Sequence, residues 1–233
     1  MSKVLEVKNL HAWYGESHIL QDVNFSVNEG EVVTLLGRNG AGRTSTLKAI
    51  MGLTGKREGS IKIHGIESIN FPTFKIAHLG VGYCPEERAI FSSLSAEENL
   101  LLPPLLKKGG MELDEIYKMF PNLLERKQSQ GTRLSGGEQQ MLAVARILRT
   151  GAKLLLVDEI SEGLAPVIVK SLSNLIITLK NKGYTILMVE QNFKFATPLA
   201  DELFVMENGQ IIEKFNSKDV DIKMPLIKNL LGV

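Results

Sequence analysis

The chain has 233 residues, of which 44% are hydrophobic and 23% are charged. This is the composition of a globular protein with one well-packed core, or with a core and an attached subdomain. With 27 basic and 26 acidic residues the net charge is +1, which argues against a nucleic-acid-binding protein held by a broad basic surface. The single cysteine, Cys84, excludes an internal disulfide and a cysteine metal cluster.

No apolar stretch approaches the roughly 18 residues needed to cross a bilayer. The nearest, residues 100–106, is interrupted by Pro103 and Pro104. The first residues, MSKVLEVKNLHAWYGE, lack the long apolar run of a signal peptide. We therefore expect a chain that is soluble by itself and that reaches any membrane through a partner.

Short runs of apolar and β-branched residues predict strands along most of the chain. In chain order these strands cover residues 4–7, 19–27, 32–36, 61–63, 81–84, 154–157 and 185–189. Helical patterns are predicted over residues 43–51, in the more polar stretch of about 86–150, and from Pro166 to Gly183. Asn208-Gly209 lies between two further strand candidates, 203–206 and 210–213, and predicts a hairpin.

Alternation of strands and helices predicts an α/β fold with a mostly parallel core sheet. The first thirty residues predict an antiparallel β layer beside it. The helical stretch predicts an inserted helical subdomain at about residues 87–150. We expect residues 1–233 to form a single domain.

A glycine-rich loop, Gly37-Arg38-Asn39-Gly40-Ala41-Gly42-Arg43-Thr44, follows a buried strand and opens a helix. That context is required of a phosphate-binding P-loop, whose glycines let backbone N–H groups curl around phosphate oxygens. The helix N-terminus adds its dipole and free donors. Thr44 would ligate Mg²⁺ through its hydroxyl, with Ser45 beside it. The alternative is a glycine-rich turn without a ligand.

Arg43 stands where the Walker A pattern of P-loops has lysine. Lysine offers a compact point charge, whereas arginine is a wider planar fork. Arg43 can still reach the β- and γ-phosphates of a nucleotide, with a different geometry.

Two carboxylates, Asp158 and Glu159, end the buried strand that begins after Lys153. This segment resembles a Walker B motif, in which the aspartate holds the Mg²⁺ bridging the phosphates. Glu159 would accept a proton from the attacking water or orient it. The end of a parallel strand is where ligands of α/β proteins bind. A surface Asp-Glu pair after a core strand is the alternative.

Leu134-Ser135-Gly136-Gly137-Glu138-Gln139-Gln140 is the most specific segment, and Ser135 lies 23 residues before Asp158. Ser135 and Glu138 form a capping box at a helix start, and the two glycines expose a backbone that can bind a γ-phosphate. An ordinary capped helix is the alternative for this segment alone.

The three motifs, in this order, resemble those of ABC transporter ATP-binding subunits, and the resemblance covers essentially all 233 residues. It implies an ABC-type P-loop NTPase that binds ATP and Mg²⁺ and hydrolyses ATP. It also implies that Ser135, Gly136 and Gly137 complete the nucleotide site of an opposing subunit, so that each ATP is held between two subunits.

Two smaller marks match positions of this family, and two further residues, Glu86 and Gln191, depart from its usual pattern. Tyr14, beside Trp13, matches the aromatic residue that stacks on adenine, although both side chains would also suit packing along a strand. Ser161-Glu162-Gly163-Leu164 matches a loop that contacts the other subunit, although a turn before Pro166 would look the same. Glu86 and Gln191 occupy the positions of a magnesium-contacting glutamine and of a γ-phosphate-contacting histidine.

Glu86 and Gln191 at these two positions make the chain resemble one subgroup of the family. This subgroup is the second, shorter ATP-binding subunit of branched-chain amino-acid importers and their urea and amide relatives. The resemblance implies catalytic roles for Glu159, Gln191 and Glu86, and a metal role for Thr44, Asp158 and Glu86. It implies a second ATP-binding subunit, in a homo- or heterodimer, and transmembrane permease subunits. A periplasmic solute-binding protein would act indirectly, and the chain would lie peripherally on the cytoplasmic face of a bacterial-type inner membrane.

Two alternatives stay open. One is a soluble ABC ATPase of DNA repair or translation, although such proteins usually carry long coiled coils or two tandem ATPase halves, and this chain has one Walker A motif and no long heptad run. The other is a subunit that binds ATP and hydrolyses it slowly, because Arg43 and Gln191 fall in the same site. The presence of Glu159 argues against slow hydrolysis, because the chain then retains the expected general base.

Overall fold

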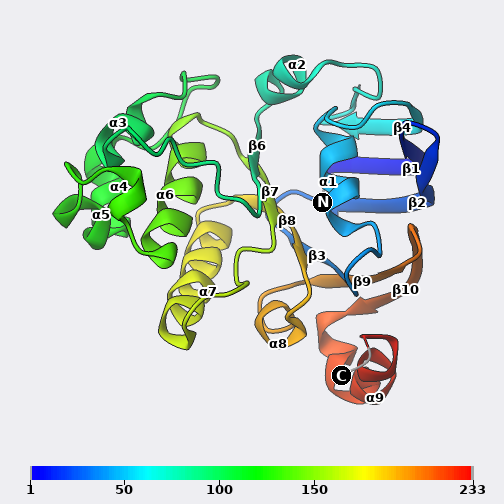
Figure 1. Cartoon of the computed structure of the whole chain (residues 1–233). Coiled ribbons are helices and arrows are strands. Elements are labelled where there is room, and N and C mark those ends of the chain that lie inside the picture. Colours follow the sequence, from blue (N-terminus) through cyan, green and yellow to red (C-terminus); the bar gives the residue numbers. More distant parts are fainter. Residues whose placement is uncertain (1, 232–233) are drawn as a thin grey trace.

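The computed structural model describes residues 2–231 and contains two β-sheets (Figure 1). The larger sheet has six strands in the order β10-β9-β3-β8-β7-β6. Only β10 runs antiparallel to its neighbour; the other five strands are parallel. Their bounds are β3 Val32–Gly37, β6 Val81–Cys84, β7 Leu154–Asp158, β8 Thr185–Glu190, β9 Glu202–Glu207 and β10 Gln210–Asn216.

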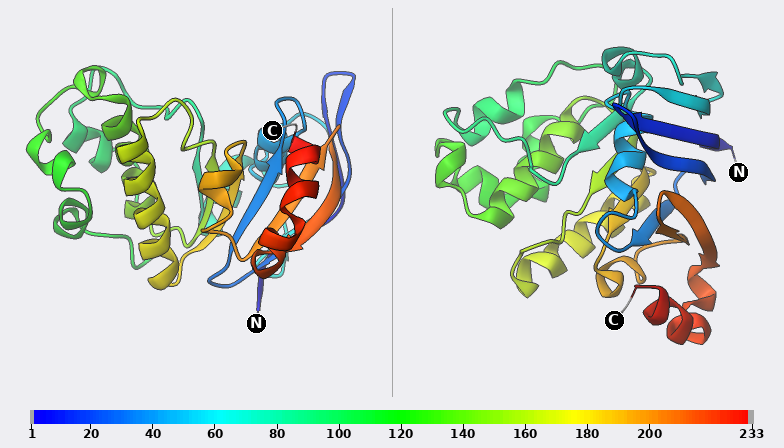
Figure 2. Two further views of the ribbon diagram at one scale, coloured as in Figure 1. Left: turned by 90° about the horizontal axis from the view of Figure 1, so that it is seen from below. Right: turned by 45° about the vertical axis from the view of Figure 1, so that its right-hand side comes forward.

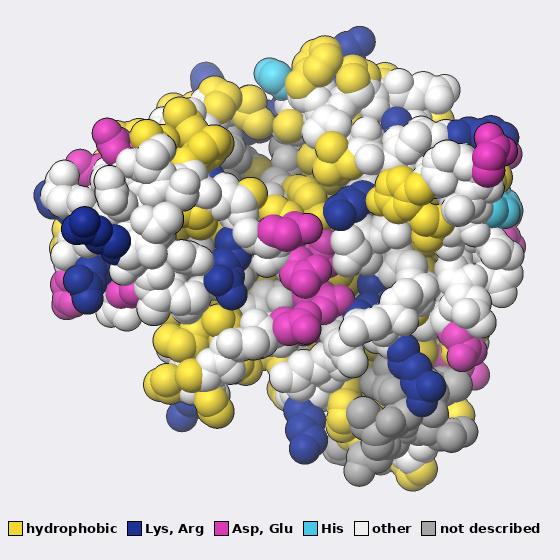
Figure 3. All heavy atoms as spheres, in the orientation of Figure 1, with side chains coloured by type: hydrophobic (Ala, Val, Ile, Leu, Met, Phe, Trp, Pro, Cys, Tyr) yellow, Lys and Arg dark blue, Asp and Glu magenta, His cyan; other side chains and the backbone are white. Residues whose placement is uncertain are grey.

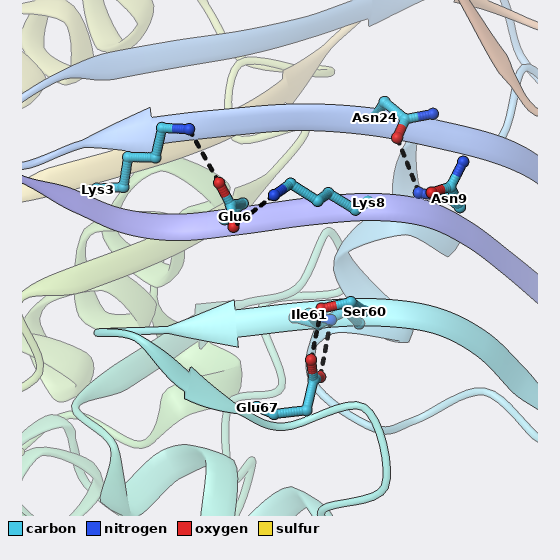
Figure 4. A network of polar contacts seen from close by, with 8 residues as sticks. All are labelled: Lys3, Glu6, Lys8, Asn9, Asn24, Ser60, Ile61 and Glu67. Carbon is cyan, nitrogen blue, oxygen red and sulfur yellow. Dashed lines mark hydrogen bonds and ion pairs between the residues drawn. The ribbon is translucent and has the colours of Figure 1, made fainter.

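The smaller sheet is antiparallel, in the order β2-β1-β4-β5. Its strands are β1 Lys3–Tyr14, β2 Ser17–Asn28, β4 Arg57–Ile63 and β5 Ile66–Glu67. Polar contacts tie together its exposed side chains, as between Lys3, Glu6 and Lys8 along β1 (Figure 4). Glu67 accepts hydrogen bonds from Ser60 and from the backbone N–H of Ile61 on β4. The mostly parallel sheet and the antiparallel layer beside it confirm the predicted α/β fold class.

Helices surround the parallel sheet, and those between β6 and β7 gather on one side of the molecule (Figure 2). The α-helices are α1 Arg43–Ile50, α2 Thr73–His78, α3 Ala96–Leu101, α4 Leu113–Met119, α5 Pro121–Glu125, α6 Gly136–Arg149, α7 Pro166–Asn181, α8 Phe193–Ala196 and α9 Val220–Leu231. Two short 3-10 turns are η1 Gly131–Arg133 and η2 Ser217–Asp219.

The apolar core lies on both faces of the parallel sheet. On one face Leu35 and Val189 pack with α1 and the inner residues of the antiparallel sheet. On the other face Leu155 and Met188 pack with α6, α7 and the helices between β6 and β7. Successive residues of a central parallel strand point to opposite faces, so both must be apolar. Five of the six buried residues of β3 are apolar or glycine, and Thr34 is the exception. The strand fixes the start of the glycine-rich loop.

Most predicted elements appear, with longer strands than the apolar runs alone indicated. The hairpin turn at Asn208-Gly209 is present, and both residues have the positive φ, 48° and 77°, that its turn type requires. The stretch of about 86–150 is less helical than predicted, because residues 102–112 and 126–135 form no α-helix. Helices α2, α8 and α9 were not predicted. In residues 2–231 no helix has both the length and the apolar character to cross a membrane.

Candidate functional site

The glycine-rich loop links β3 to α1 and owes its shape to three glycines. Gly40 and Gly42 have φ values of 83° and 102°, which side chains rarely tolerate. Gly37 allows a close approach, since a Cβ there would lie 2.6 Å from the carbonyl oxygen of Met206. A hydrogen bond from the turn after β9 also holds the loop, because the N–H of Gly209 donates to the carbonyl of Ala41. The backbone therefore has the form that a P-loop needs.

Thr44 and Asp158 meet at the mouth of this loop. The Thr44 hydroxyl donates to Oδ1 of Asp158 at 2.9 Å, and the Tyr83 hydroxyl donates to Oδ2 at 2.9 Å. Burial raises the pKa of Asp158, and burial together with the neighbouring carboxylate raises the pKa of Tyr83. Tyr83 therefore stays protonated and orients the carboxylate by donating to it.

Arg43 and Glu159 form a buried ion pair. Nη2 of Arg43 lies 2.6 Å from Oε1 of Glu159, and their side chains are 3% and 9% exposed. Nη2 also donates to Oδ1 of Asn39 at 3.2 Å. Glu159 has a positive φ of 46°, a conformation that costs a residue with a side chain about 1–2 kcal/mol. The strain accompanies a turn that aims the carboxylate at the loop.

A hollow of about 490 Å³ opens beside these residues. The P-loop residues Asn39 to Ser45 line one side of it, and Glu86, Glu159 and Glu162 line the other. Acidic side chains gather at the middle of this face of the molecule (Figure 3). Burial and a hydrogen bond with Glu162 raise the pKa of Glu159 to about 7, and burial and Glu162 also raise the pKa of Glu86.

A second hollow, of about 520 Å³, adjoins the first because Glu159 and Glu162 line both. Gln191, which is exposed, lines this second hollow together with Glu190. Glu190 is buried and accepts hydrogen bonds from the N–H and the hydroxyl of Ser161. Burial raises the pKa of Glu190 to about 7. Gln191 therefore lies beside the hollow that shares Glu159 and Glu162 with the P-loop hollow, and it does not line the P-loop hollow itself.

The LSGGE segment lines neither hollow. Ser135 caps α6, accepting from the N–H of Glu138, whose carboxylate accepts from the N–H of Ser135. Gly137 packs against α7, where a Cβ would lie 2.8 Å from Cγ2 of Ile168. Gly136 has more space, since a Cβ would lie 3.5 Å from the guanidinium of Arg88. Within the described chain, Ser135, Gly136 and Gly137 are therefore not brought to the P-loop.

Two predicted nucleotide contacts lie at the edge of the site. Tyr14 ends β1 with 39% of its surface exposed, and it does not line the P-loop hollow. Its neighbour Trp13 stacks on His18, with ring centroids 4.3 Å apart. Arg38 lines a smaller hollow on the other side of the P-loop, next to Glu207.

The residues present fit a magnesium nucleotide. Hydroxyl and carboxylate oxygens are the donors that Mg²⁺ prefers, and neighbouring ligands of an octahedral ion at about 2.1 Å lie about 3 Å apart. Thr44 Oγ1 and Asp158 Oδ1 lie 2.9 Å apart. The P-loop backbone supplies anion-binding N–H groups at the start of α1. In addition, Nη1 of Arg43 is a buried nitrogen that has no hydrogen-bond partner here.

The family model described as ABC transporter matches residues 20–162, which is more than half of the chain and includes the P-loop, the LSGGE segment and Asp158-Glu159. The chain belongs to the ABC transporter family. Its members hydrolyse ATP, so this ABC cassette is an ATPase subunit of a transporter.

Individual relatives and solved structures support the same family assignment. The high-affinity branched-chain amino acid transport ATP-binding protein BraG of Pseudomonas aeruginosa is 39% identical over 212 residues, covering 90% of this chain and 91% of that protein. The lipopolysaccharide export system ATP-binding protein LptB of Haemophilus influenzae is 32% identical over 215 residues, covering 90% and 89%. The crystal structure of the ADP conformation of another ABC cassette superposes with a TM-score of 0.82 at 25% identity, covering 100% of both chains.

Several residues of this ABC cassette's site were not predicted as such. Tyr83 was seen only as part of a strand, and its contact with Asp158 joins positions 75 residues apart. Glu162 was named only within a longer motif, and Glu190 was not named as a site residue. A signal for Glu190 was available, because an acidic residue directly after the apolar run 185–189 is placed like Asp158 at the end of its strand.

Proposed function

We propose that this chain powers an importer of branched-chain amino acids, as one half of a dimer that holds two ATP molecules between its subunits. The similarity to BraG carries the proposal, because it extends over nine-tenths of both chains. The closed dimer would drive alternating access in the membrane subunits, and hydrolysis would reopen it.

Each half-site would combine residues from two subunits. Residues 37–45 would cradle the phosphates, Tyr14 would stack on adenine, and Ser135, Gly136 and Gly137 would contact the partner's ATP. Mg²⁺ supplies a Lewis acid that neutralises phosphate charge when bound, and Thr44, Asp158 and Glu86 would hold it. Glu159 would orient the attacking water or accept its proton. Gln191 would offer neutral hydrogen bonds to the γ-phosphate.

The proposed partners are a second ATP-binding subunit and transmembrane permease subunits on the cytoplasmic face of the inner membrane. A periplasmic solute-binding protein would deliver the solute to the permease, and no nucleic acid is involved. The similarity to LptB makes the cargo the part of this proposal that most needs a test.

The activity is tested by measuring ATP binding and Mg²⁺-dependent hydrolysis by the purified chain and its Glu159→Gln variant. We expect both proteins to bind ATP and only the wild type to hydrolyse it. Undiminished hydrolysis by the variant would exclude Glu159 as the general base. Stimulation of the wild-type rate by DNA or ribosomes would instead favour a soluble ABC ATPase.

The cargo is tested by co-expressing the chain with candidate permease subunits of a branched-chain amino-acid importer and reconstituting the purified complex in vesicles. We expect ATP hydrolysis to rise when a binding protein loaded with leucine, isoleucine or valine is added. Stimulation by urea or short amides would replace the proposed cargo, and failure to co-purify with any membrane subunit would contradict the importer.

A further inference from the structure

The ion pair between Arg43 and Glu159 joins the two sides of the proposed catalytic site. Arg43 is the first residue of α1, and Glu159 directly follows β7. Their closest atoms are 2.6 Å apart, and both side chains are more than nine-tenths buried. A buried charge depends on its partner, because little water is available to replace that partner. When its carboxyl is ionised, Glu159 therefore compensates the charge of Arg43.

The guanidinium of Arg43 has more donors than its present contacts use. Nη2 donates to both Glu159 and Asn39, whereas Nη1 is buried and has no hydrogen-bond partner among residues 2–231. Arginine carries five N–H donors in a fixed fork that matches carboxylate and phosphate oxygens equally well. Because Arg43 also lines the P-loop hollow, a phosphate entering that hollow meets a guanidinium that is already engaged by a carboxylate.

We propose that Arg43 has two alternative anionic partners, Glu159 before a nucleotide binds and a nucleotide phosphate afterwards. The inference rests on the proposed nucleotide binding and adds to it a competition within the same site. A nucleotide must displace the carboxylate, so its affinity is lower than the P-loop alone would give. Displacement releases Glu159 only when a phosphate is in place, so the base becomes available together with its substrate.

Geometry explains why the competition depends on arginine. Nη2 of Arg43 reaches Glu159 and Asn39 together, because this one nitrogen carries two N–H donors in the plane of the guanidinium. Lysine presents one compact charge on a shorter reach and does not reproduce a planar fork. In an Arg43→Lys variant, the ion pair with Glu159 should therefore be weaker. Glu159 should then compete less with a phosphate for residue 43.

The test is a double-mutant cycle on the affinity of the isolated chain for a fluorescent ADP analogue, measured in EDTA. ADP without Mg²⁺ permits no turnover, so trapping of unhydrolysed ATP cannot imitate the effect. The four proteins are the wild type, Glu159→Gln, Arg43→Lys and the double variant. Thermal unfolding confirms that each is folded. Arg43→Gln replaces Arg43→Lys if the latter fails to fold, because it also removes the guanidinium.

We expect Glu159→Gln to tighten ADP about tenfold, or about 1.4 kcal/mol, when Arg43 is present. In the Arg43→Lys or Arg43→Gln background the same change should alter the affinity less than about twofold, because contacting residues in one network do not act additively. An equal effect in both backgrounds would overturn the competition and leave the proposed function intact. No ADP binding by any folded protein of the set would overturn both.

Discussion

Tyr83 orients one oxygen of Asp158 while Thr44 holds the other. Partners that hydrogen-bond to a metal-binding carboxylate typically change metal affinity or activity 10- to 100-fold when removed. We expect Tyr83→Phe to raise the Mg²⁺ concentration for half-maximal hydrolysis about tenfold, and to cost about 1 kcal/mol of unfolding free energy.

Tyr117→Phe is the matched control, because it removes a 2.8 Å hydrogen bond from another tyrosine to Glu97, away from the P-loop. It should change stability by a similar amount and leave the Mg²⁺ dependence unchanged. If both variants shifted the Mg²⁺ dependence equally, Tyr83 would have no special connection with Asp158.

Glu190 makes the stability of the chain depend on pH. Burial raises its pKa to about 7 from an ordinary value of 4.5. Between these two values the folded chain holds a proton that the unfolded chain has released, so stability falls as pH rises through this window and levels off above about pH 7. A Glu190→Gln variant has no titrating proton at this position, so its stability lacks this pH dependence.

Urea unfolding of the wild type and of Glu190→Gln at pH 5 and pH 8 measures this effect. The wild type should lose about 2–3 kcal/mol relative to the variant between the two pH values. Changes at other carboxylates affect both proteins and cancel in the comparison. Parallel pH profiles would show that Glu190 is already ionised in the folded chain at pH 5.

At the scale of elements, the contact between α6 and α7 explains the second glycine of the LSGGE segment. A Cβ on Gly137 would lie within 3.0 Å of three atoms of Ile168, whereas the nearest atom to a Cβ on Gly136 is 3.5 Å away. Overpacking of this kind costs about 1–3 kcal/mol. Gly137→Ala should therefore lower the melting temperature by about 3–10 °C.

Gly136→Ala, the neighbouring control, should leave the melting temperature unchanged or raise it slightly, since alanine favours helix over glycine. Adding Ile168→Ala to Gly137→Ala should recover part of the loss by making room. If both alanine substitutions had the same effect, packing against α7 would not be the reason for glycine at position 137.

The elements also show where sequence reasoning succeeded. Strand β3 and the P-loop were predictable because the apolar run and the glycines act locally. Helix α9 was not predicted, and Pro225 lies inside it, where proline usually argues against a helix. Ile227 of α9 is nevertheless buried with Leu36 and Phe215, so tertiary packing outweighs the local cost. The residue pairs Arg43–Glu159 and Tyr83–Asp158 depend on the folded sheet, and no local pattern encodes them.

At the scale of the whole molecule, the turn after β9 joins the two sheets. The N–H of Gly209 donates to Ala41 in the P-loop, and its carbonyl accepts from the N–H of Gln21 on β2. A Cβ on Gly209 would lie 2.0 Å from the carbonyl oxygen of Ile19. Because backbone cannot move aside as a side chain can, Gly209→Ala should cost more than about 2 kcal/mol and weaken nucleotide binding.

Gly183→Ala is the control that separates backbone strain at a positive φ from the steric clash with a neighbouring backbone. Gly183 has a φ of 79°, close to the 77° of Gly209, but nothing lies within 4 Å of the position of its Cβ. Gly183→Ala should cost only the backbone strain of about 1 kcal/mol and leave nucleotide affinity unchanged. Equal losses in the two variants would mean that the turn does not hold the sheets together.

The strand order has a consequence for how the protein is made. Strand β3, which carries the P-loop, lies between β8 and β9, and both neighbours come from the last fifty residues. On a translating ribosome, the glycine-rich loop therefore emerges before the strands that flank β3. At about 5–20 residues per second, the wait is on the order of ten seconds or more. Until then both edges of β3 lack the strands that pair with them in the folded chain, and unpaired strand edges of this kind favour aggregation.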